Sequence, residues 1–89
     1  MAHCPLELLD DLDDLFAELR SWARVIEKKR TVFYVRGQPF LHFHLREGGR
    51  RQADIKGRTG WVRHDLPRPL SATRRQAFLR ELRRRHAEK

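Results

Sequence analysis

Two histidines and one aspartate are the side chains of this sequence that could do chemistry together. His42 and His44 lie two positions apart in one run of alternating residues, and Asp54 lies in a second such run. Side chains two positions apart on a β-strand point to the same face of a sheet. Two imidazoles and a carboxylate on one face could hold a metal ion, or His42 could act as a general acid–base with Asp54 as its partner.

The sequence does not supply the other parts of an active site. No serine or cysteine stands beside these residues, and the only cysteine is Cys4, near the start of the chain. The sequence also lacks a glycine-rich phosphate loop and the ligand spacing of a zinc finger. We therefore assign no catalytic residue and no cofactor, expect a non-enzymatic protein, and keep a metal or acid–base site at His42, His44 and Asp54 as an alternative.

The elements that must position these side chains follow from the spacing of apolar residues. Between residues 5 and 29 they recur every three or four positions, which predicts one long amphipathic helix. Ser71 or Thr73 can cap a final helix over residues 72–87. Between the helices, β-branched and aromatic runs separated by glycine-containing turns predict four strands, at about residues 31–36, 40–46, 50–56 and 61–64.

These elements predict an α+β fold in which residues 1–89 form a single domain. The order is α-β-β-β-β-α, with the strands as an antiparallel meander and both helices on one sheet face. A chain of this length buries one modest core, so little of it is left to cover the second face of the sheet. We call this second face the outer face and expect it to be exposed.

The register of the second and third strands follows from the turn between them. A three-residue loop of residues 47–49 sets His42 opposite Asp54 and His44 opposite Gln52, with apolar partners on the core side. A shift by one residue would mix polar and apolar side chains on each face. The turns on either side set the register of the first and fourth strands in the same way. The turn before the second strand is predicted to have Gly37 and Gln38 as its central residues. The predicted residues of the outer face are Phe33, Val35, Phe40, His42, His44, Asp54, Lys56, Trp61 and Arg63.

The aromatic residues of the predicted outer face favour a role in binding. Phe33, Phe40 and Trp61 would form a large exposed apolar patch, and such patches usually mark interaction sites. Our first hypothesis is therefore an interaction module that binds a partner, or a second copy of the chain to form a homo-oligomer, through this face.

The charge of the chain makes nucleic acid an alternative partner. The net charge is +8, and residues 31–89 carry fifteen basic and five acidic side chains. A basic surface of this size attracts polyanions, although arginine-rich surfaces also occur without that function. The candidate nucleic-acid residues of the last predicted helix are Arg74, Arg75, Arg80, Arg83, Arg84 and Arg85.

The sequence predicts a cytoplasmic protein that does not bind membranes. No run of 18 apolar residues could form a transmembrane helix, and the first residues lack the basic and apolar parts of a signal peptide. A single cysteine cannot form a disulfide within the chain, which fits a reducing compartment.

Three segments resemble a family of small bacterial proteins of unassigned function. They are residues 28–34, the Phe-Leu-His-Phe-His run of residues 40–44, and the Ala-Asp-Ile-Lys run of residues 53–56. The resemblance covers roughly residues 25–63 and implies no activity. The order of helix, meander and helix is also similar to that of frataxin-like and double-wing DNA-binding domains, and a similarity of fold carries no residue roles.

Overall fold

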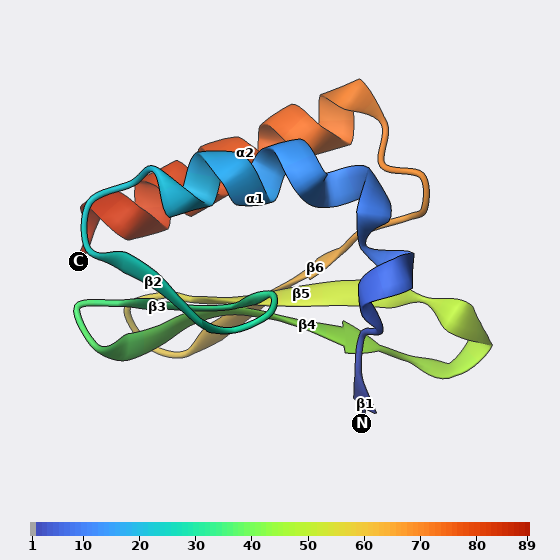
Figure 1. The fold of residues 1–89 in the computed structure, drawn as a ribbon, viewed down its shortest axis with the longest axis horizontal. Helices are drawn as coiled ribbons and strands as arrows, with labels where there is room; N and C mark the ends of the chain where they lie inside the picture. The colour runs from blue at the N-terminus through green and yellow to red at the C-terminus, as the bar shows by residue number, and fades with distance from the viewer. Residues whose placement is uncertain (1) are drawn as a thin grey trace.

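A meander of antiparallel strands carries two helices on one of its faces (Figure 1). The structure is a computed structural model and describes residues 2–89. The helices are α1 (Asp13–Arg20) and α2 (Ala72–Ala87), and short 3-10 turns occupy Leu6–Leu8, Asp10–Leu12 and Glu47–Gly49. The strands are β1 (Ala2–His3), β2 (Val25–Lys29), β3 (Val32–Val35), β4 (Gln38–Leu45), β5 (Arg51–Lys56) and β6 (Trp61–Asp65).

The sheet has one more meander strand than the sequence predicted. Its order is β2-β3-β4-β5-β6, so each strand pairs with the next one along the chain, and the two-residue β1 pairs with β4. The expected α+β class, with an antiparallel sheet and N- and C-terminal helices, is confirmed. The expected number of four strands is wrong, because β2 was assigned to the first helix.

The predicted helix over residues 5–29 is much shorter in the structure. Before α1 the chain forms only 3-10 turns, and after α1 it turns at Arg24, whose φ of 64° lies in the left-handed region. β2 then begins with the β-branched Val25 and runs along the edge of the sheet. Within α1 the apolar residues do form the buried side of a helix, and Leu15 and Leu19 are among them.

The first hairpin turn differs from the prediction by one residue. The turn residues are Arg36 and Gly37, with φ values of 53° and 80°, instead of Gly37 and Gln38. Two successive left-handed residues form a type I′ turn, which matches the twist of the flanking strands. The displaced turn alone changes the pairing by two residues, which leaves each side chain on its predicted face. The faces of β3 exchange because the pairing then slips by one further residue, between Tyr34–Pro39 and Phe33–Leu41.

Phe33, Val35 and Phe40 consequently lie in the core, and their predicted place on the outer face is wrong. Phe33 and Val35 are buried on the helix side of β3. Phe40 lies where the register between β3 and β4 shifts, so it is the extra residue of a β-bulge. Its side chain is fully buried, with its ring centroid 6.3 Å from that of His86 in α2.

The two hairpins that join β4, β5 and β6 have the predicted register. The loop between β4 and β5 is residues 47–49, and the backbone N–H of Arg46 donates to the carbonyl of Arg50 at 2.7 Å across its base. Most polar residues of these three strands therefore fall on the outer face and most apolar residues on the helix side. The outer-face pairs are His42–Asp54, His44–Gln52, Asp54–Arg63 and Lys56–Trp61.

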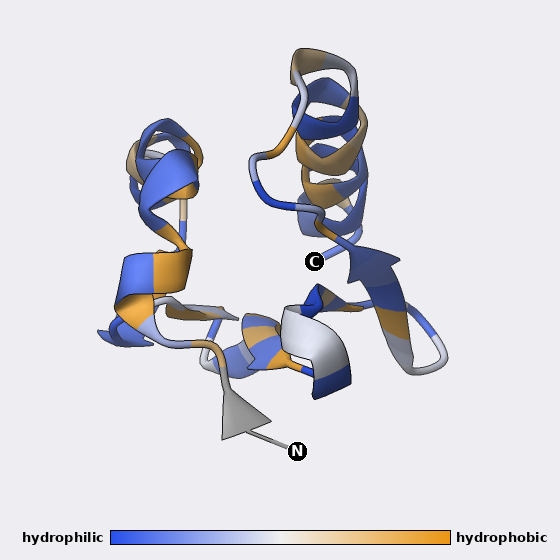
Figure 2. Cartoon of the chain, turned by 90° about the vertical axis from the view of Figure 1, so that its right-hand side faces the viewer, coloured by the Kyte–Doolittle hydropathy of each residue, from blue (hydrophilic) through white to orange (hydrophobic). Residues whose placement is uncertain are grey.

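The core lies between the sheet and the helices. Figure 2 shows the two helices standing apart on the same side of the sheet, with hydrophobic segments along each of them. Phe16 of α1 stacks on Phe33 at a centroid distance of 5.8 Å and meets Phe43 edge-on at 5.5 Å. Phe78 and Leu82 are the buried residues of α2. Among residues 2–89, no helix has the length and hydrophobicity needed to cross a membrane.

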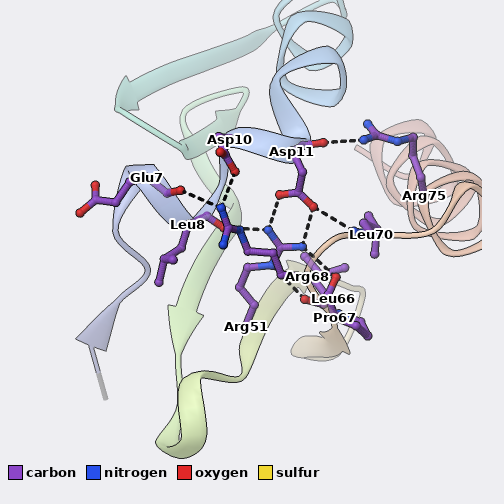
Figure 3. A network of polar contacts seen from close by, with 10 residues as sticks. All are labelled: Glu7, Leu8, Asp10, Asp11, Arg51, Leu66, Pro67, Arg68, Leu70 and Arg75. Atoms are coloured by element: carbon purple, nitrogen blue, oxygen red, sulfur yellow. Dashed lines mark hydrogen bonds and ion pairs between the residues drawn. The ribbon is translucent and has the colours of Figure 1, made fainter.

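A buried arginine connects the N-terminal segment to the chain that follows β6 (Figure 3). Arg51, at the start of β5, is 4% exposed. Its guanidinium donates hydrogen bonds to both carboxylate oxygens of Asp11 and to the carbonyl oxygens of Leu8, Leu66 and Pro67. One side chain thus fixes three segments that are far apart in the sequence.

Candidate functional site

The outer face of the sheet brings together most of the side chains that the sequence marked as functional. α1 and α2 both lie on the opposite face (Figure 1). Of the nine predicted residues, three are in the core and six lie together on β4, β5 and β6. These six are His42, His44, Asp54, Lys56, Trp61 and Arg63.

His42, His44 and Asp54 form a compact group that we call the His–Asp cluster. Nε2 of His44 lies 3.2 Å from Oδ2 of Asp54, and the two imidazole rings meet edge to face with centroids 4.4 Å apart. Each residue offers one potential ligand atom, and these three atoms lie within 4.8 Å of one another. Asp54 is 5% exposed and both histidines are partly buried. The cluster is therefore built into the sheet surface and does not project from it.

Arg63 orients the carboxylate of the His–Asp cluster from the neighbouring strand. Its Nε donates to Oδ1 of Asp54 at 3.2 Å, while about half of the Arg63 side chain remains exposed. One carboxylate oxygen is thus bonded to arginine, and the other faces His44.

Trp61 forms the exposed edge of the same site. Its ring centroid lies 4.5 Å from that of His42, in an edge-to-face arrangement. The Nζ atom of Lys56 lies 5.1 Å from the indole centroid, within the range of a cation–π interaction. Trp61 is 42% exposed, so the site presents a large aromatic ring to solvent.

Three outer-face residues were missed by the sequence analysis. Tyr34 lies between the buried Phe33 and Val35 on β3 and therefore points outward. The Nζ atom of Lys28 lies 4.5 Å from the Tyr34 ring centroid, and the exposed Ile26 pairs with Tyr34 across β2 and β3. The sequence feature that could have revealed β2 is the pair of β-branched residues at its start, Val25 and Ile26, because such residues favour a strand.

The two aromatic–cation pairs lie near the same end of the sheet. Tyr34 pairs with Pro39 near the start of β4, and Lys56 pairs with Trp61 at the end of β5, which runs alongside the start of β4. Three strand spacings separate β3 from β6, which corresponds to about 14 Å at about 4.8 Å per spacing. The two pairs therefore lie on the same part of the outer face, on strands separated by β4 and β5.

Several arginines of α2 are neutralised by their own chain. Arg83 pairs with Glu18 of α1 at 2.6 Å, and this hydrogen bond holds the pKa of Glu18 below its usual value. Arg84 and Arg85 both pair with Glu81, at 2.8 Å and 2.9 Å. These three side chains hold helices and helical turns together, which reduces the positive charge that they present to a ligand.

The remaining α2 arginines differ in how exposed their charge is. Arg75 donates a hydrogen bond to the carbonyl of Asp11 and so bridges to the N-terminal segment. Arg74 and Arg80 are exposed and form no ion pair with the acids of residues 2–89. Among the six α2 arginines that the sequence singled out, these two are the most available cations.

Comparison with known proteins identifies no relative of this chain. No protein-family model matches it, and no curated protein or solved structure does. The resemblance to a small bacterial family stays a prediction, and the function is inferred below from the chemistry of the outer face.

Proposed function

We propose that this protein binds single-stranded nucleic acid on its outer face. The observation that carries the proposal is the presence of two solvent-accessible aromatic rings, each with a lysine beside it. These pairs are Trp61 with Lys56 and Tyr34 with Lys28, both on the sheet face opposite the helices. The net charge of +8 adds a general attraction for a polyanion.

An aromatic ring next to a cation offers the two interactions that bind single strands. A base that stacks on the ring gains about 1–3 kcal/mol with little dependence on sequence, and the lysine attracts the adjacent phosphate. Because the two rings lie on different strands of one sheet face, they would contact different nucleotides of one bound strand. A duplex gains less from such rings, because its bases already stack on each other.

The position of the phenylalanines weakens the alternative of self-association. Phe33 and Phe40, which made the outer face look apolar, are fully buried in the core. The outer face instead carries Lys28, Lys56 and Arg63, while its buried acid, Asp54, is already paired. Two such faces brought together would place like charges opposite each other, which disfavours a dimer.

Fluorescence anisotropy with labelled single strands of about 12 nucleotides tests the proposal. We expect binding at 50 mM salt that weakens about 20-fold at 200 mM salt, if about three phosphates are neutralised at a logarithmic slope of about −0.7 each. Trp61→Ala should weaken binding about 5- to 150-fold, the equivalent of the stacking energy of one base. A duplex of the same sequence should lose much less affinity from this substitution.

Two charge variants locate the binding surface. K28Q/K56Q removes the two lysines beside the aromatic rings, and R74Q/R80Q removes two exposed charges from the helix side. Both variants lower the net charge by the same amount, so a general loss of attraction affects them equally. The proposal requires a clearly larger loss of affinity for K28Q/K56Q. A larger loss for R74Q/R80Q would instead place the binding surface on α2.

A further inference from the structure

We infer that His42, His44 and Asp54 form a binding site for a divalent transition-metal ion of the zinc type. The three residues come from the adjacent strands β4 and β5, and their ligand atoms lie within 4.8 Å of one another. The inference does not depend on the proposed nucleic-acid binding, and its test uses no nucleic acid.

The spacing of the ligand atoms is close to that of a bound ion. Zinc–nitrogen and zinc–oxygen bonds of about 2.0–2.2 Å place neighbouring ligand atoms about 3.3–3.5 Å apart in a tetrahedron. Nε2 of His44 and Oδ2 of Asp54 are 3.2 Å apart, so this edge of the tetrahedron is already formed. The ligand atom of His42 lies within 4.8 Å of the other two, so it has at most about 1.5 Å to move, which a side-chain rotation achieves.

The donor set selects the class of metal. Two imidazole nitrogens and one carboxylate suit zinc, cobalt and iron, whereas magnesium and calcium prefer sites made of oxygen ligands only. Three protein ligands are one fewer than a structural zinc site uses, and they leave a coordination position for water. The ion would therefore be held in an open site, on a surface that faces solvent.

The surroundings of the His–Asp cluster also fit a metal site. A ligating carboxylate is usually oriented by a further hydrogen bond, and Arg63 supplies this bond to Oδ1 of Asp54 while Oδ2 faces His44. The ring of Trp61 lies 4.5 Å from that of His42 and restricts its rotation on one side.

Cobalt and zinc titration of the tag-free full chain, after removal of metal with a chelator, tests the site. We expect one Co²⁺ per chain, with visible absorption bands that Zn²⁺ abolishes by competition. In a Trp22→Phe variant, Trp61 is the only tryptophan, and Co²⁺ should quench its fluorescence with the same midpoint as the absorption change. Mg²⁺ at the same concentrations should produce neither signal.

Substitutions of the three ligands distinguish this site from other metal-binding groups. H42Q, H44Q and D54N should each weaken Co²⁺ binding at least about 100-fold, since loss of an outer-shell partner alone costs about 10- to 100-fold. H64Q, H86Q and C4S change a histidine or the thiol outside the cluster and should leave the affinity unchanged. Circular dichroism checks that each variant is folded, and any two folded ligand variants suffice for the comparison.

Three results would overturn the inference. They are the absence of Co²⁺ and Zn²⁺ binding to the wild-type chain, an affinity that the ligand variants leave unchanged, and binding that disappears in C4S. Because the titration is made without nucleic acid, a negative result leaves the proposed binding of single strands intact. A positive result likewise says nothing in favour of that binding.

Discussion

Replacing Arg51 with methionine removes every hydrogen bond of a buried guanidinium while keeping much of the side-chain volume. The guanidinium donates to Asp11 and to three backbone carbonyls, and Arg51 is 4% exposed (Figure 3). In the variant, Asp11 keeps the backbone N–H of Leu70 as a donor at 2.9 Å but loses its counter-ion. The three carbonyl oxygens lose a strong donor at the same time.

We expect the Arg51→Met variant to lose about 3 kcal/mol of unfolding free energy. Removal of one partner of a buried ion pair costs about 3–5 kcal/mol. The Asp11 side chain is 19% exposed, so water screens part of its charge and the lower end of that range applies. A domain of this length has a total unfolding free energy of about 4–13 kcal/mol. Arg51→Lys keeps the charge but has three donors in place of five, so its loss should be smaller.

Urea denaturation followed by circular dichroism at pH 7 measures these losses. The double variant R51M/D11L should be less destabilised than the sum of the two single variants by more than about 1 kcal/mol, because it leaves no unpaired charge. A loss below about 1 kcal/mol for Arg51→Met, or strict additivity in the double variant, would refute the role given to this contact.

The same ion pair predicts the direction of a pH effect. The hydrogen bond from Arg51 holds the pKa of Asp11 below its usual value. A lowered pKa in the folded state gives stability that is complete above the ordinary range of an aspartate and is lost as the pH falls through the lowered pKa. The difference in unfolding free energy between wild type and Asp11→Asn should therefore shrink in acid, and a constant difference would contradict this assignment.

Three further predictions concern stability. Arg36→Asn should raise the unfolding free energy by about 0.5–1 kcal/mol, or the melting temperature by about 2–8 °C, because a type I′ turn favours asparagine where arginine now has a φ of 53°; an unchanged melting temperature would argue against strain at this turn. Burial lowers the pKa of His64, which faces Glu81 and Arg85 of α2, so the unfolded chain takes up the proton first and stability should fall as the pH drops below about 6.5, the ordinary pKa of a histidine. His64→Phe should flatten that fall in urea titrations, and an identical pH profile would show that another group causes it. Leu82→Ala should cost about 2–5 kcal/mol in the same assay, because Leu82 is a fully buried residue of α2, and a loss below about 1 kcal/mol would place it outside the core.

The register of β4, β5 and β6 could be predicted because the turns between them are marked by glycine. Gly48 and Gly49 both have positive φ, and Gly57 and Gly60 close the next turn through a backbone hydrogen bond of 2.7 Å. Each of these turns has a length that only one register fits. The grouping of His42, His44 and Asp54 follows from that register and from the alternation of side chains along each strand.

The parts that could not be predicted depend on non-glycine residues in the left-handed region. Arg24, Thr31 and Arg36 all have positive φ, and no sequence signal marks such a position for arginine or threonine. Arg24 directly precedes β2, Thr31 lies in the turn between β2 and β3, and Arg36 begins the turn between β3 and β4. Without them, β2 resembles a continuation of the helix, and the β3–β4 turn is predicted one residue too late. The bulge at Phe40, which the prediction also lacks, decides the face on which Phe33 lies.

Two indole signals in an NMR titration test the central claim most directly. The chain has two tryptophans, Trp61 on the outer face and Trp22 on the helix side, where the Trp22 indole N–H donates to Glu18 and its ring lies beside that of His86. A single-stranded oligonucleotide added to ¹⁵N-labelled protein should shift the indole signal of Trp61 in a saturable way and leave that of Trp22 in place. A shift of Trp22 alone, or no shift of either signal at low salt, would contradict the binding of single strands on the outer face.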